Sequence, residues 1–368
     1  MSCNSEMFLR QAAEAARLRS FFEMSGAQLV EADMLQPAEV LLDLYGEDIR
    51  ARAYVTSDPL RGELMLRPDF TVPVVQMHMN HGAEPARYTY SGKVFRRQEE
   101  DLGRASEYLQ VGYEVFDRDD PAGADAEVFA LFNGVLRGKG LTAVTGDMGI
   151  LRAAISGLST SDRRKAALER HIWRPRKFRS LLDRYSNRTP LPAVRVKLLE
   201  LMDTNSVDVL LENAGAQVGL RREADVRARL EVIKADAQEQ PISRSEAEML
   251  EEILTLRAPA PQALSTLRDI AVDLPKVNGA IEGFETRLNA MAQRGIDVAN
   301  LDFDASHGRS SMEYYDGFVF SFLKPGQPPV ATGGRYDALT KVLGQGRSIP
   351  AVGGVIRPDL LINAESAQ

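Results

Sequence analysis

Cysteine, histidine and long apolar runs are scarce in this sequence, and each scarcity excludes a class of protein. Its 368 residues include one cysteine, Cys3, so a disulfide within the chain and a site built on several cysteines are excluded. The four histidines, His78, His81, His171 and His307, lack HxxxH and HExxH spacing, which argues against a histidine-rich metal site. No apolar run reaches the ~18 residues of a membrane-spanning helix, and no signal-peptide pattern begins the chain. These absences predict a cytoplasmic protein with no metal site and no membrane contact.

The composition is that of an ordinary soluble globular protein without an excess of basic residues. Hydrophobic residues make up 44% and charged residues 26%, and the formal net charge is −7. A chain of this length is expected to form two domains, or one large domain with an insertion. The negative balance argues against broad nucleic-acid binding, unless the basic residues gather locally.

The pattern of predicted elements changes twice along the chain. Residues 1–157 mix amphipathic helices with short strands in hairpins, and residues 263–368 return to strands such as EYYDGFVFSFL. Residues 158–262 show almost only helical periodicity with many charges, and they end on APAPQ, which is typical of a linker. The sequence therefore predicts an α+β fold, in which an antiparallel sheet flanked by helices is interrupted by a helical insertion.

Polar side chains stand inside apolar strand patterns at four places. These places are LRPDFT (66–71), VFRRQ (94–98), YLQVGYEVF (108–116) and YYDGFVFSF (314–322). In the third, Gln110, Gly112 and Glu114 are two residues apart, so they share one face of a strand. We expect Gly112 to leave that face open to the close approach of a ligand.

Two interpretations of these polar groups remain open. Charged residues on a half-solvated sheet can form a structural ion-pair network, for example between Arg96 and Glu114. Alternatively, the polar groups converge on a ligand. Because an arginine fork suits a carboxylate, and the acceptors Asp69, Gln110 and Glu114 suit an ammonium group, the ligand that fits is an amino acid.

At these residues the chain resembles histidyl-tRNA synthetase, a class II aminoacyl-tRNA synthetase. Within that superfamily it is most similar to the paralogue that serves as regulatory subunit of the short form of ATP phosphoribosyltransferase. The matching stretches are LRPDFT, VFRRQEEDLGRASEYLQVGYEVFD, DPAGADAEVFAL, YYDGFVF, GGRYDAL and IPAVGG. The resemblance implies a class II synthetase-like core made of residues 1–157 and 263–368, with residues 158–262 as the insertion.

The resemblance also implies a binding site for histidine. The implied site residues are Asp69, Thr71, Arg96, Gln110, Glu114, Arg309, Tyr314 and Tyr315. By their positions in the matching stretches, Asp69 and Thr71 would hold the α-amino group, and Gln110 would contact the amino-acid backbone. Arg96 would contact the carboxylate and the α-phosphate of a nucleotide.

The imidazole end of this implied site involves the remaining residues. Glu114 and Tyr314 match the residues that read the imidazole, and Tyr315 lines the same pocket. Buried groups that hydrogen-bond an imidazole are left unpaired by an amino acid that lacks one, so the rejection of other amino acids is strong.

Departures from the synthetase pattern fall on the ATP side. The pattern RGLDYY is SSMEYY here, so the catalytic arginine aligns with Ser310, and the ATP-binding arginine of the third motif aligns with Leu360. Arg309 and Arg357 are the neighbouring residues that could compensate. Losing two cations that stabilise a phosphoryl transition state removes several kcal/mol of electrostatic catalysis. The chain ends soon afterwards, which implies that the anticodon-binding domain of the synthetase is missing.

The resemblance therefore implies a regulatory subunit without catalytic activity or cofactor. Its partner would be the catalytic subunit of short-form ATP phosphoribosyltransferase, which condenses ATP with phosphoribosyl pyrophosphate at the start of histidine biosynthesis. The chain would self-associate as a homodimer and take L-histidine as its effector, and tRNA is not expected as a partner. Two alternatives stay open: a truncated synthetase-like enzyme that activates histidine with ATP and Mg²⁺, and a free-standing histidine-binding module.

The helical insertion contains a basic segment, RRKAALERHIWRPRKFR (163–179). Arginines and lysines alternate there with Trp173 and Phe178, a mixture found on anion- or nucleic-acid-binding surfaces. The alternative is a solvated helix face, or a contact with a protein partner, in which the basic residues pair with the acidic remainder. The second interpretation is the one that we favour from the sequence.

Overall fold

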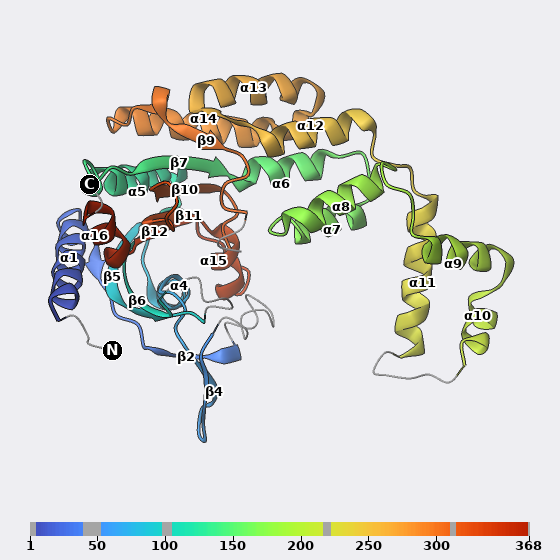
Figure 1. The fold of residues 1–368 in the computed structure, drawn as a ribbon, viewed down its shortest axis with the longest axis horizontal. Coiled ribbons are helices and arrows are strands. Elements are labelled where there is room, and N and C mark those ends of the chain that lie inside the picture. The colour runs from blue at the N-terminus through green and yellow to red at the C-terminus, as the bar shows by residue number, and fades with distance from the viewer. Residues whose placement is uncertain (1–4, 40–52, 98–104, 216–221, 310–313, 367–368) are drawn as a thin grey trace. The chain divides into compact units, whose positions relative to one another are not determined.

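The computed structural model describes residues 5–39, 53–97, 105–215, 222–309 and 314–366 (Figure 1). Contacts divide the chain into two compact units, of which the first comprises residues 1–153 with 253–368 and the second residues 154–252. The division predicted from the sequence, at 157/158 and 262/263, stays a prediction. Within the described ranges, no helix has the length and apolar character that crossing a membrane requires.

A nine-stranded sheet forms the centre of the first unit, as far as the described residues show, with the order β1-β5-β6-β12-β11-β10-β7-β9-β8. The strands are β1 (Gln28–Leu29), β5 (Ala86–Phe95), β6 (Glu107–Phe116), β7 (Thr142–Asp147), β8 (Arg257–Pro259), β9 (Asp302–Asp304), β10 (Phe318–Leu323), β11 (Ala331–Arg335) and β12 (Ala351–Ile356). Neighbouring strands are antiparallel, except that β1 with β5 and β7 with β9 are parallel. The predicted α+β fold with an antiparallel sheet is confirmed.

One face of the sheet is covered by helices on an aromatic core. The helices are α1 (Ser5–Met24), α5 (Pro121–Val135), α6 (Met148–Gly157), α13 (Ala260–Asp273) and α14 (Asn278–Gln293), with short 3₁₀ turns at Pro275–Val277 and Val298–Asn300. Asp120 caps α5 by accepting a hydrogen bond from the Gly123 backbone N–H at 2.8 Å. The ring of Phe22 on α1 lies 5.2 Å from that of Tyr113 on β6. These contacts fix the side of β6 that faces away from Glu114.

Helix α4 (Thr71–His81) packs on the opposite face of β6. The unit also contains the small sheet β2 (Leu35–Pro37), β4 (Gly62–Leu66) and β3 (Val55–Asp58), and the helices α15 (Asp337–Leu343) and α16 (Pro358–Ser366). The ring of His78 on α4 stacks on Phe116 of β6 at 3.9 Å. Helix α4 therefore starts at one end of β6, next to the polar residues of that strand.

A buried ion-pair network joins α5, β7, α14 and β11. Arg287 on α14 is 6% exposed and donates to the carboxylates of Asp125 and Asp147. Arg335, at the end of β11, donates to the other oxygen of Asp125 from Nη2 at 2.7 Å. Because each of these charges has a partner, the network can exist inside the core.

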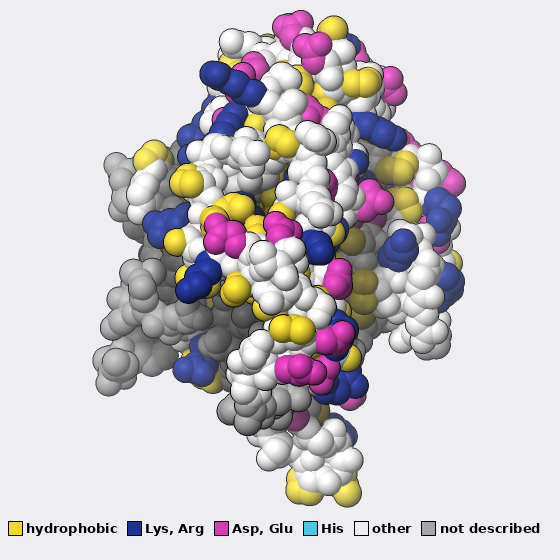
Figure 2. Space-filling view, turned by 90° about the vertical axis from the view of Figure 1, so that its right-hand side faces the viewer, with side chains coloured by type: hydrophobic (Ala, Val, Ile, Leu, Met, Phe, Trp, Pro, Cys, Tyr) yellow, Lys and Arg dark blue, Asp and Glu magenta, His cyan; other side chains and the backbone are white. Residues whose placement is uncertain are grey.

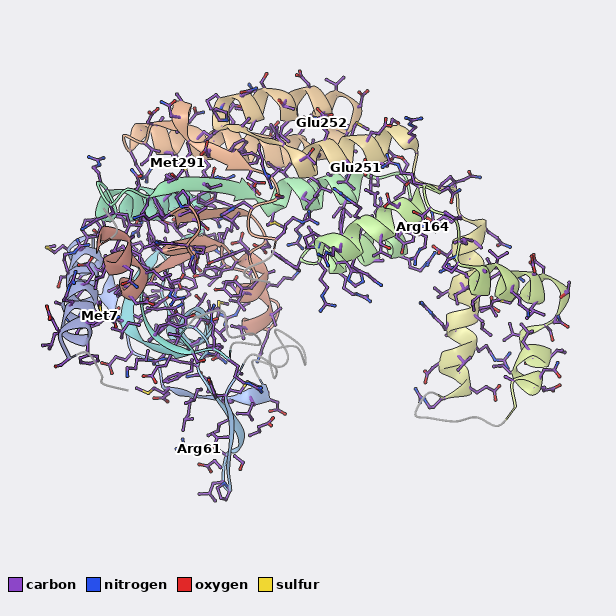
Figure 3. All side chains as sticks on the ribbon, viewed as in Figure 1. Met7, Arg61, Arg164, Glu251, Glu252 and Met291 are labelled. Atoms are coloured by element: carbon purple, nitrogen blue, oxygen red, sulfur yellow. The ribbon has the colours of Figure 1, made fainter. Side chains whose placement is uncertain are left out.

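The second unit is helical throughout its described residues. Its elements are α7 (Asp162–Arg170), α8 (Pro175–Tyr185), α9 (Ala193–Thr204), α10 (Val207–Asn213) and α11 (Glu223–Gln238), and α12 (Arg244–Thr255) leads back to the first unit. Arg164, labelled in Figure 3, extends from α7 and is 5% exposed, and its Nε donates to Asp236 on α11 at 2.9 Å. This pair ties the first helix of the unit to its longest one.

The predicted linker at residues 258–262 is wrong. Residues 257–259 form the edge strand β8, which pairs with β9, and α13 begins at Ala260. Proline lacks a backbone N–H, and both an edge strand and the start of a helix tolerate that loss. The composition APAPQ therefore fits ordered structure as well as a linker.

Candidate functional site

Glu114 lies at the centre of a buried group of hydroxyls. Its side chain, on β6, is 1% exposed. Oε1 accepts hydrogen bonds from Thr71 Oγ1 at 3.0 Å and Tyr90 OH at 2.8 Å, and Oε2 accepts one from Tyr336 OH at 2.6 Å. The carboxyl group is thus held in one orientation by three neutral donors from α4, β5 and the β11–α15 connection.

The ion pair between Arg96 and Glu114, which was the example given for the structural interpretation, is not formed between these described residues. Arg96 is half-buried, and its Nε donates to the carbonyl oxygen of Pro68 at 2.8 Å. The partners of Glu114 are hydroxyl groups instead of a guanidinium. A carboxylate without a counter-charge in the core is costly, and such a group is a functional-site candidate.

Burial changes the acidity of the groups around Glu114. Loss of solvent raises the pKa of Glu114 to about 7, the negative charge of Asp69 adds to this rise, and the three hydroxyl hydrogen bonds oppose it. Burial and the neighbouring Glu114 raise the pKa values of Tyr90 and Tyr336 well above their ordinary range. Near neutral pH the hydroxyls therefore remain donors, and Glu114 exchanges a proton easily.

Two glycines give the large side chains of this group their space. A Cβ on Gly353, which lies opposite Glu114 in the β6–β12 register, would overlap the Glu114 carboxyl group. A Cβ on Gly112 would overlap the ring of Tyr90, its partner across β5 and β6. The expectation that Gly112 admits a ligand is wrong, because the space over it is filled by Tyr90.

The segment between β4 and α4 brings Asp69 and Thr71 to Glu114. Asp69 is 4% exposed, and its Oδ1 accepts a hydrogen bond from the Val72 backbone N–H at 3.3 Å at the start of α4. Phe70 stacks on Tyr90 with ring centroids 4.5 Å apart and an interplanar angle of 9°. This stack holds the segment against β5, so Asp69 lies close enough to act on the pKa of Glu114.

Gln110 carries an unpaired acceptor on the same face of β6. Its side chain is 2% exposed, and among the described residues its Oε1 has no hydrogen-bond partner. Buried side-chain oxygens nearly always have a partner, so such an exception calls for a donor beyond the described residues, such as a water or a ligand. Gln110 and Glu114 are four residues apart on one strand and therefore face the same side.

Tyr315 and Tyr314 complete the group. Tyr315 is 4% exposed, and its pKa is raised by burial and by the charges of Glu114 and Asp69, while Arg96 acts in the opposite direction. The Tyr314 ring centroid lies 4.8 Å from that of Tyr315 and 6.1 Å from that of Tyr336. We call the whole set the Glu114 cluster; it comprises Asp69, Thr71, Tyr90, Arg96, Gln110, Glu114, Tyr314, Tyr315 and Tyr336.

Arg309 is the predicted site residue with the least direct link to this cluster. It is 6% exposed, and the neighbouring Gly308 packs against the side chain of Val319 on β10. Val319 lies opposite Gly334 on β11, and Gly334 lies opposite Gly353 next to Glu114. Gly308 therefore lies on the side of the sheet that carries Glu114, over β10, two strands away from β12, and Arg309 follows Gly308 in the chain. Ser310 lies outside the described residues.

The comparisons with known proteins agree with the geometry. The model of the histidyl-tRNA synthetase family matches residues 5–241 and 195–361. An ATP phosphoribosyltransferase regulatory subunit from Agrobacterium fabrum is 32% identical over 354 residues, which cover 92% of this chain and 93% of that protein. The chain belongs to the family of ATP phosphoribosyltransferase regulatory subunits. The regulatory subunit of Brucella anthropi is 32% identical over 94% of this chain and 95% of its own.

Solved structures show the fold of this regulatory-subunit family. An ATP phosphoribosyltransferase regulatory subunit/histidyl-tRNA synthetase from Bacillus halodurans matches with a TM-score of 0.68 at 20% identity, over 97% of this chain and 79% of that one. A histidine–tRNA ligase subunit from Alicyclobacillus acidocaldarius matches with a TM-score of 0.57 at 22% identity, over 100% and 95% of the two chains. The predicted class II synthetase-like fold is confirmed, and family membership confirms the prediction of a regulatory, non-catalytic chain.

Arg357, a candidate replacement for the ATP-binding arginine, is engaged elsewhere in this regulatory subunit. Its Nη2 donates to Asp359 Oδ2 at 2.7 Å, and its guanidinium carbon lies 3.8 Å from the centroid of the Tyr108 ring. The charge of Arg357 is therefore already balanced by a carboxylate. The predicted loss of both synthetase arginines stays a prediction.

Tyr90 and Tyr336 are the members of the cluster that the sequence analysis missed. Tyr336 follows the Gly-Gly pair of ATGGRYDAL, and Tyr90 lies two residues before Gly92 in a strand with several aromatic residues. For Tyr90 the available signal is Gly112, which lies opposite it: a buried glycine in one strand makes room for a large residue in its neighbour. That signal needs the strand register, which the sequence alone does not provide.

Proposed function

We propose that this chain binds L-histidine in the Glu114 cluster and thereby regulates the catalytic subunit of short-form ATP phosphoribosyltransferase. It acts in the cytoplasm, as a homodimer that associates with the catalytic subunit, and it does not bind tRNA. In this role it activates the first step of histidine biosynthesis and transmits feedback inhibition by histidine. Family membership supports the partner. The observation that carries the ligand is the buried Oε1 of Gln110, which has no partner among the described residues and lies on the same strand face as Glu114.

The acceptors of the cluster suit the α-ammonium group of a free amino acid. An ammonium group has three N–H donors and a positive charge. Gln110 Oε1 offers a buried acceptor without a partner, and Asp69 offers a buried negative charge. Arg96 is the cation of the cluster and suits the ligand carboxylate.

Glu114 suits an imidazole because the acidities of the two groups match. An imidazole has an unperturbed pKa of ~6.5, and the pKa of Glu114 is about 7. In a hydrogen-bonded pair with matched pKa values, a shared proton can lie on either the carboxyl group or the imidazole near neutral pH. A side chain without ring nitrogens would leave Glu114 without this partner, which is the physical basis for the selection of histidine.

A turnover assay of the two-subunit complex tests this function. The purified chain is mixed with a short-form ATP phosphoribosyltransferase catalytic subunit, and formation of phosphoribosyl-ATP is measured with and without L-histidine. We expect the chain to raise turnover and L-histidine to lower it again. Because coupling between two sites is reciprocal for binding, the catalytic subunit should change the histidine affinity of the chain by the same factor.

Two results would contradict the proposal. If the added chain does not change turnover, the proposed association with the catalytic subunit is contradicted. If the chain raises turnover but L-histidine does not lower it, the proposed role of histidine as effector is contradicted. Histidine-dependent exchange of labelled diphosphate into ATP by the chain alone would favour the synthetase-like enzyme instead. Since Arg357 is paired with Asp359, we expect no such exchange.

A further inference from the structure

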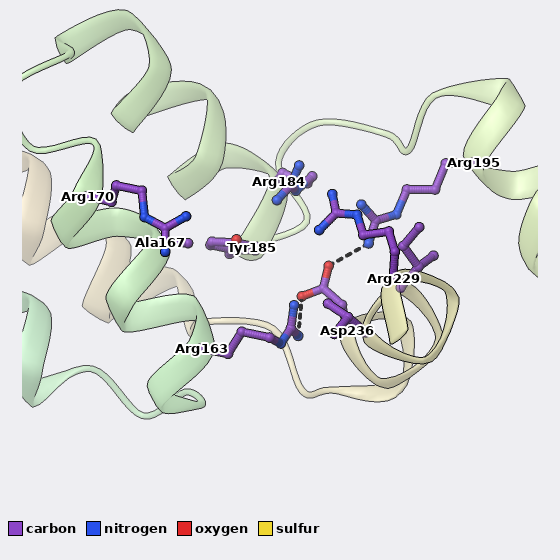
Figure 4. A pocket seen from close by; sticks show the side chains of 10 residues that line it. Arg163, Ala167, Arg170, Arg184, Tyr185, Arg195, Arg229 and Asp236 are labelled. Carbon is purple, nitrogen blue, oxygen red and sulfur yellow. Dashed lines mark hydrogen bonds and ion pairs between the residues drawn. The ribbon is translucent and has the colours of Figure 1, made fainter. Parts of the chain in front are cut away.

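The helical second unit contains a partly open cavity, half of whose lining residues are arginines. Its volume is about 160 Å³, well above the ~10–15 Å³ that admits a single water molecule. The lining comes from α7, α8, the start of α9 and α11 (Figure 4). We call it the arginine cavity, after its five lining arginines Arg163, Arg170, Arg184, Arg195 and Arg229.

One carboxylate stands among these five guanidinium groups. Asp236 on α11 is 7% exposed and accepts hydrogen bonds from Arg163 Nη2 at 2.8 Å and Arg195 Nη2 at 2.6 Å. Its other partner is Arg164, which lies behind the cavity wall and donates from Nε at 2.9 Å. Burial raises the pKa of Asp236, but Arg164 and Arg163 outweigh it and lower the pKa below its ordinary value, so the carboxylate is charged at neutral pH.

Three of the lining arginines have no carboxylate of their own. Arg170, Arg184 and Arg229 form no ion pair with any described residue, although Arg184 lies over the Tyr185 ring at 4.8 Å. Figure 4 shows the guanidinium groups of Arg184, Arg195 and Arg229 gathered beside Asp236. Like charges that line one cavity repel each other, and a bound anion reduces that repulsion.

Two buried N–H donors of the lining are also unpaired. Arg184 Nε and Arg195 Nε are shielded from solvent, and neither has a hydrogen-bond partner among the described residues. Unsatisfied buried donors are rare in folded proteins and indicate a missing water, ion or ligand. The unpaired donors call for a hydrogen-bond acceptor, and the arginines without an ion pair independently favour an acceptor that carries negative charge.

We propose that the arginine cavity binds a small phosphate-bearing anion. A planar guanidinium group can donate two parallel hydrogen bonds to two oxygens of one phosphate group. Several guanidinium groups around one cavity therefore suit a mono- or diphosphate group. Tyr185, Val232 and Ile233 supply an apolar and aromatic part of the lining, which can cover the non-phosphate part of the ligand. Asp236 holds two of the arginines in place when the site is empty, and its charge limits the affinity.

A small anion fits the cavity better than an extended polyanion. A nucleic-acid surface needs a basic stripe over many phosphates, whereas the face in Figure 2 carries acidic and basic side chains interspersed. The whole chain is also acidic, with a formal charge of −7. The basic segment 163–179 is therefore divided: Arg163 and Arg170 face the cavity, and Arg164 is buried against Asp236.

Calorimetric titration of the full chain tests this site. Orthophosphate, diphosphate and ATP are titrated separately at constant ionic strength, which distinguishes a single phosphate from a polyphosphate or nucleotide. The double variant Arg184→Gln/Arg229→Gln removes two unpaired cations, and we expect it to weaken the tightest of the three probes by at least about tenfold. The matched control is Arg179→Gln, which removes one exposed arginine of the same unit outside the cavity and should leave affinity within about twofold.

The outcomes decide the proposal in both directions. If the double variant does not fold by circular dichroism, Arg229→Gln alone replaces it, because Arg229 is solvent-exposed; we expect a loss of about threefold or more. The proposal is overturned if none of the three probes gives heat, or if the control loses as much affinity as the cavity variant. It is also overturned if a single-stranded RNA binds more tightly than every small probe and competes with them.

Discussion

Replacing Glu114 with alanine is expected to raise the L-histidine concentration for half-inhibition of the phosphoribosyltransferase complex by about 100-fold. The substitution removes the group proposed to pair with the imidazole, and losing one partner of a buried, charge-assisted hydrogen bond costs about 2–4 kcal/mol. Assembly should persist, because Glu114 is 1% exposed and lies inside the core of its own chain. Inhibition curves of the reconstituted complex, with co-elution of both subunits as the check on assembly, measure both effects.

Two further variants separate this effect from a general loss of structure. Glu107→Ala removes an acidic side chain from the same strand, but Glu107 is exposed and pairs with Lys93 at the surface, so the inhibition curve should not move. Glu114→Gln keeps the volume and one acceptor oxygen, which can serve Thr71 and Tyr90, while its NH2 group can donate to the hydroxyl oxygen of Tyr336. This variant should therefore fold and still lose most of the inhibition. An unchanged curve for both Glu114 variants would show that histidine acts elsewhere.

Replacing Arg287 with alanine is expected to lower the free energy of unfolding by about 3–5 kcal/mol. The substitution leaves Asp147 without its guanidinium partner and removes one of the two guanidiniums that Asp125 contacts. Removing one member of a buried ion-pair network leaves an uncompensated charge, which is far more costly than losing a surface pair. It also removes the contact of the guanidinium with the Phe318 ring, at 4.6 Å.

Urea unfolding followed by circular dichroism measures this loss. The control is Arg268→Ala on α13, which removes an exposed pair with Glu285 of α14 and should cost less than about 1 kcal/mol. Equal midpoints for the Arg287 variant and the wild type would contradict the role given to the network.

The sequence predicts the fold and seven of the nine members of the cluster, and local patterns account for part of this success. The two-residue spacing of Gln110, Gly112 and Glu114 correctly predicts that they share one face of a strand, because side chains alternate across a strand. The hairpin pattern around residues 92–117 likewise predicts the β5–β6 pair. Strand and turn signals of this kind are local, so they can be detected without knowing the register.

The remaining features depend on register and packing, which the sequence does not reveal. Gly112 accommodates Tyr90 because the two residues are opposite each other across β5 and β6. The hydroxyl of Tyr336 reaches Glu114 from 222 residues further along the chain. Likewise, the basic segment 163–179 does not reveal that Arg163 and Arg170 meet Arg195 and Arg229 from later helices.

Calorimetric titration of the purified wild-type chain with L-histidine tests the central claim most directly. The account predicts a saturable heat with one histidine per chain, and little or no heat with L-alanine, which has the same backbone groups and no imidazole. Absence of heat with L-histidine, or equal heats with both amino acids, would contradict the assignment of the Glu114 cluster as a histidine site.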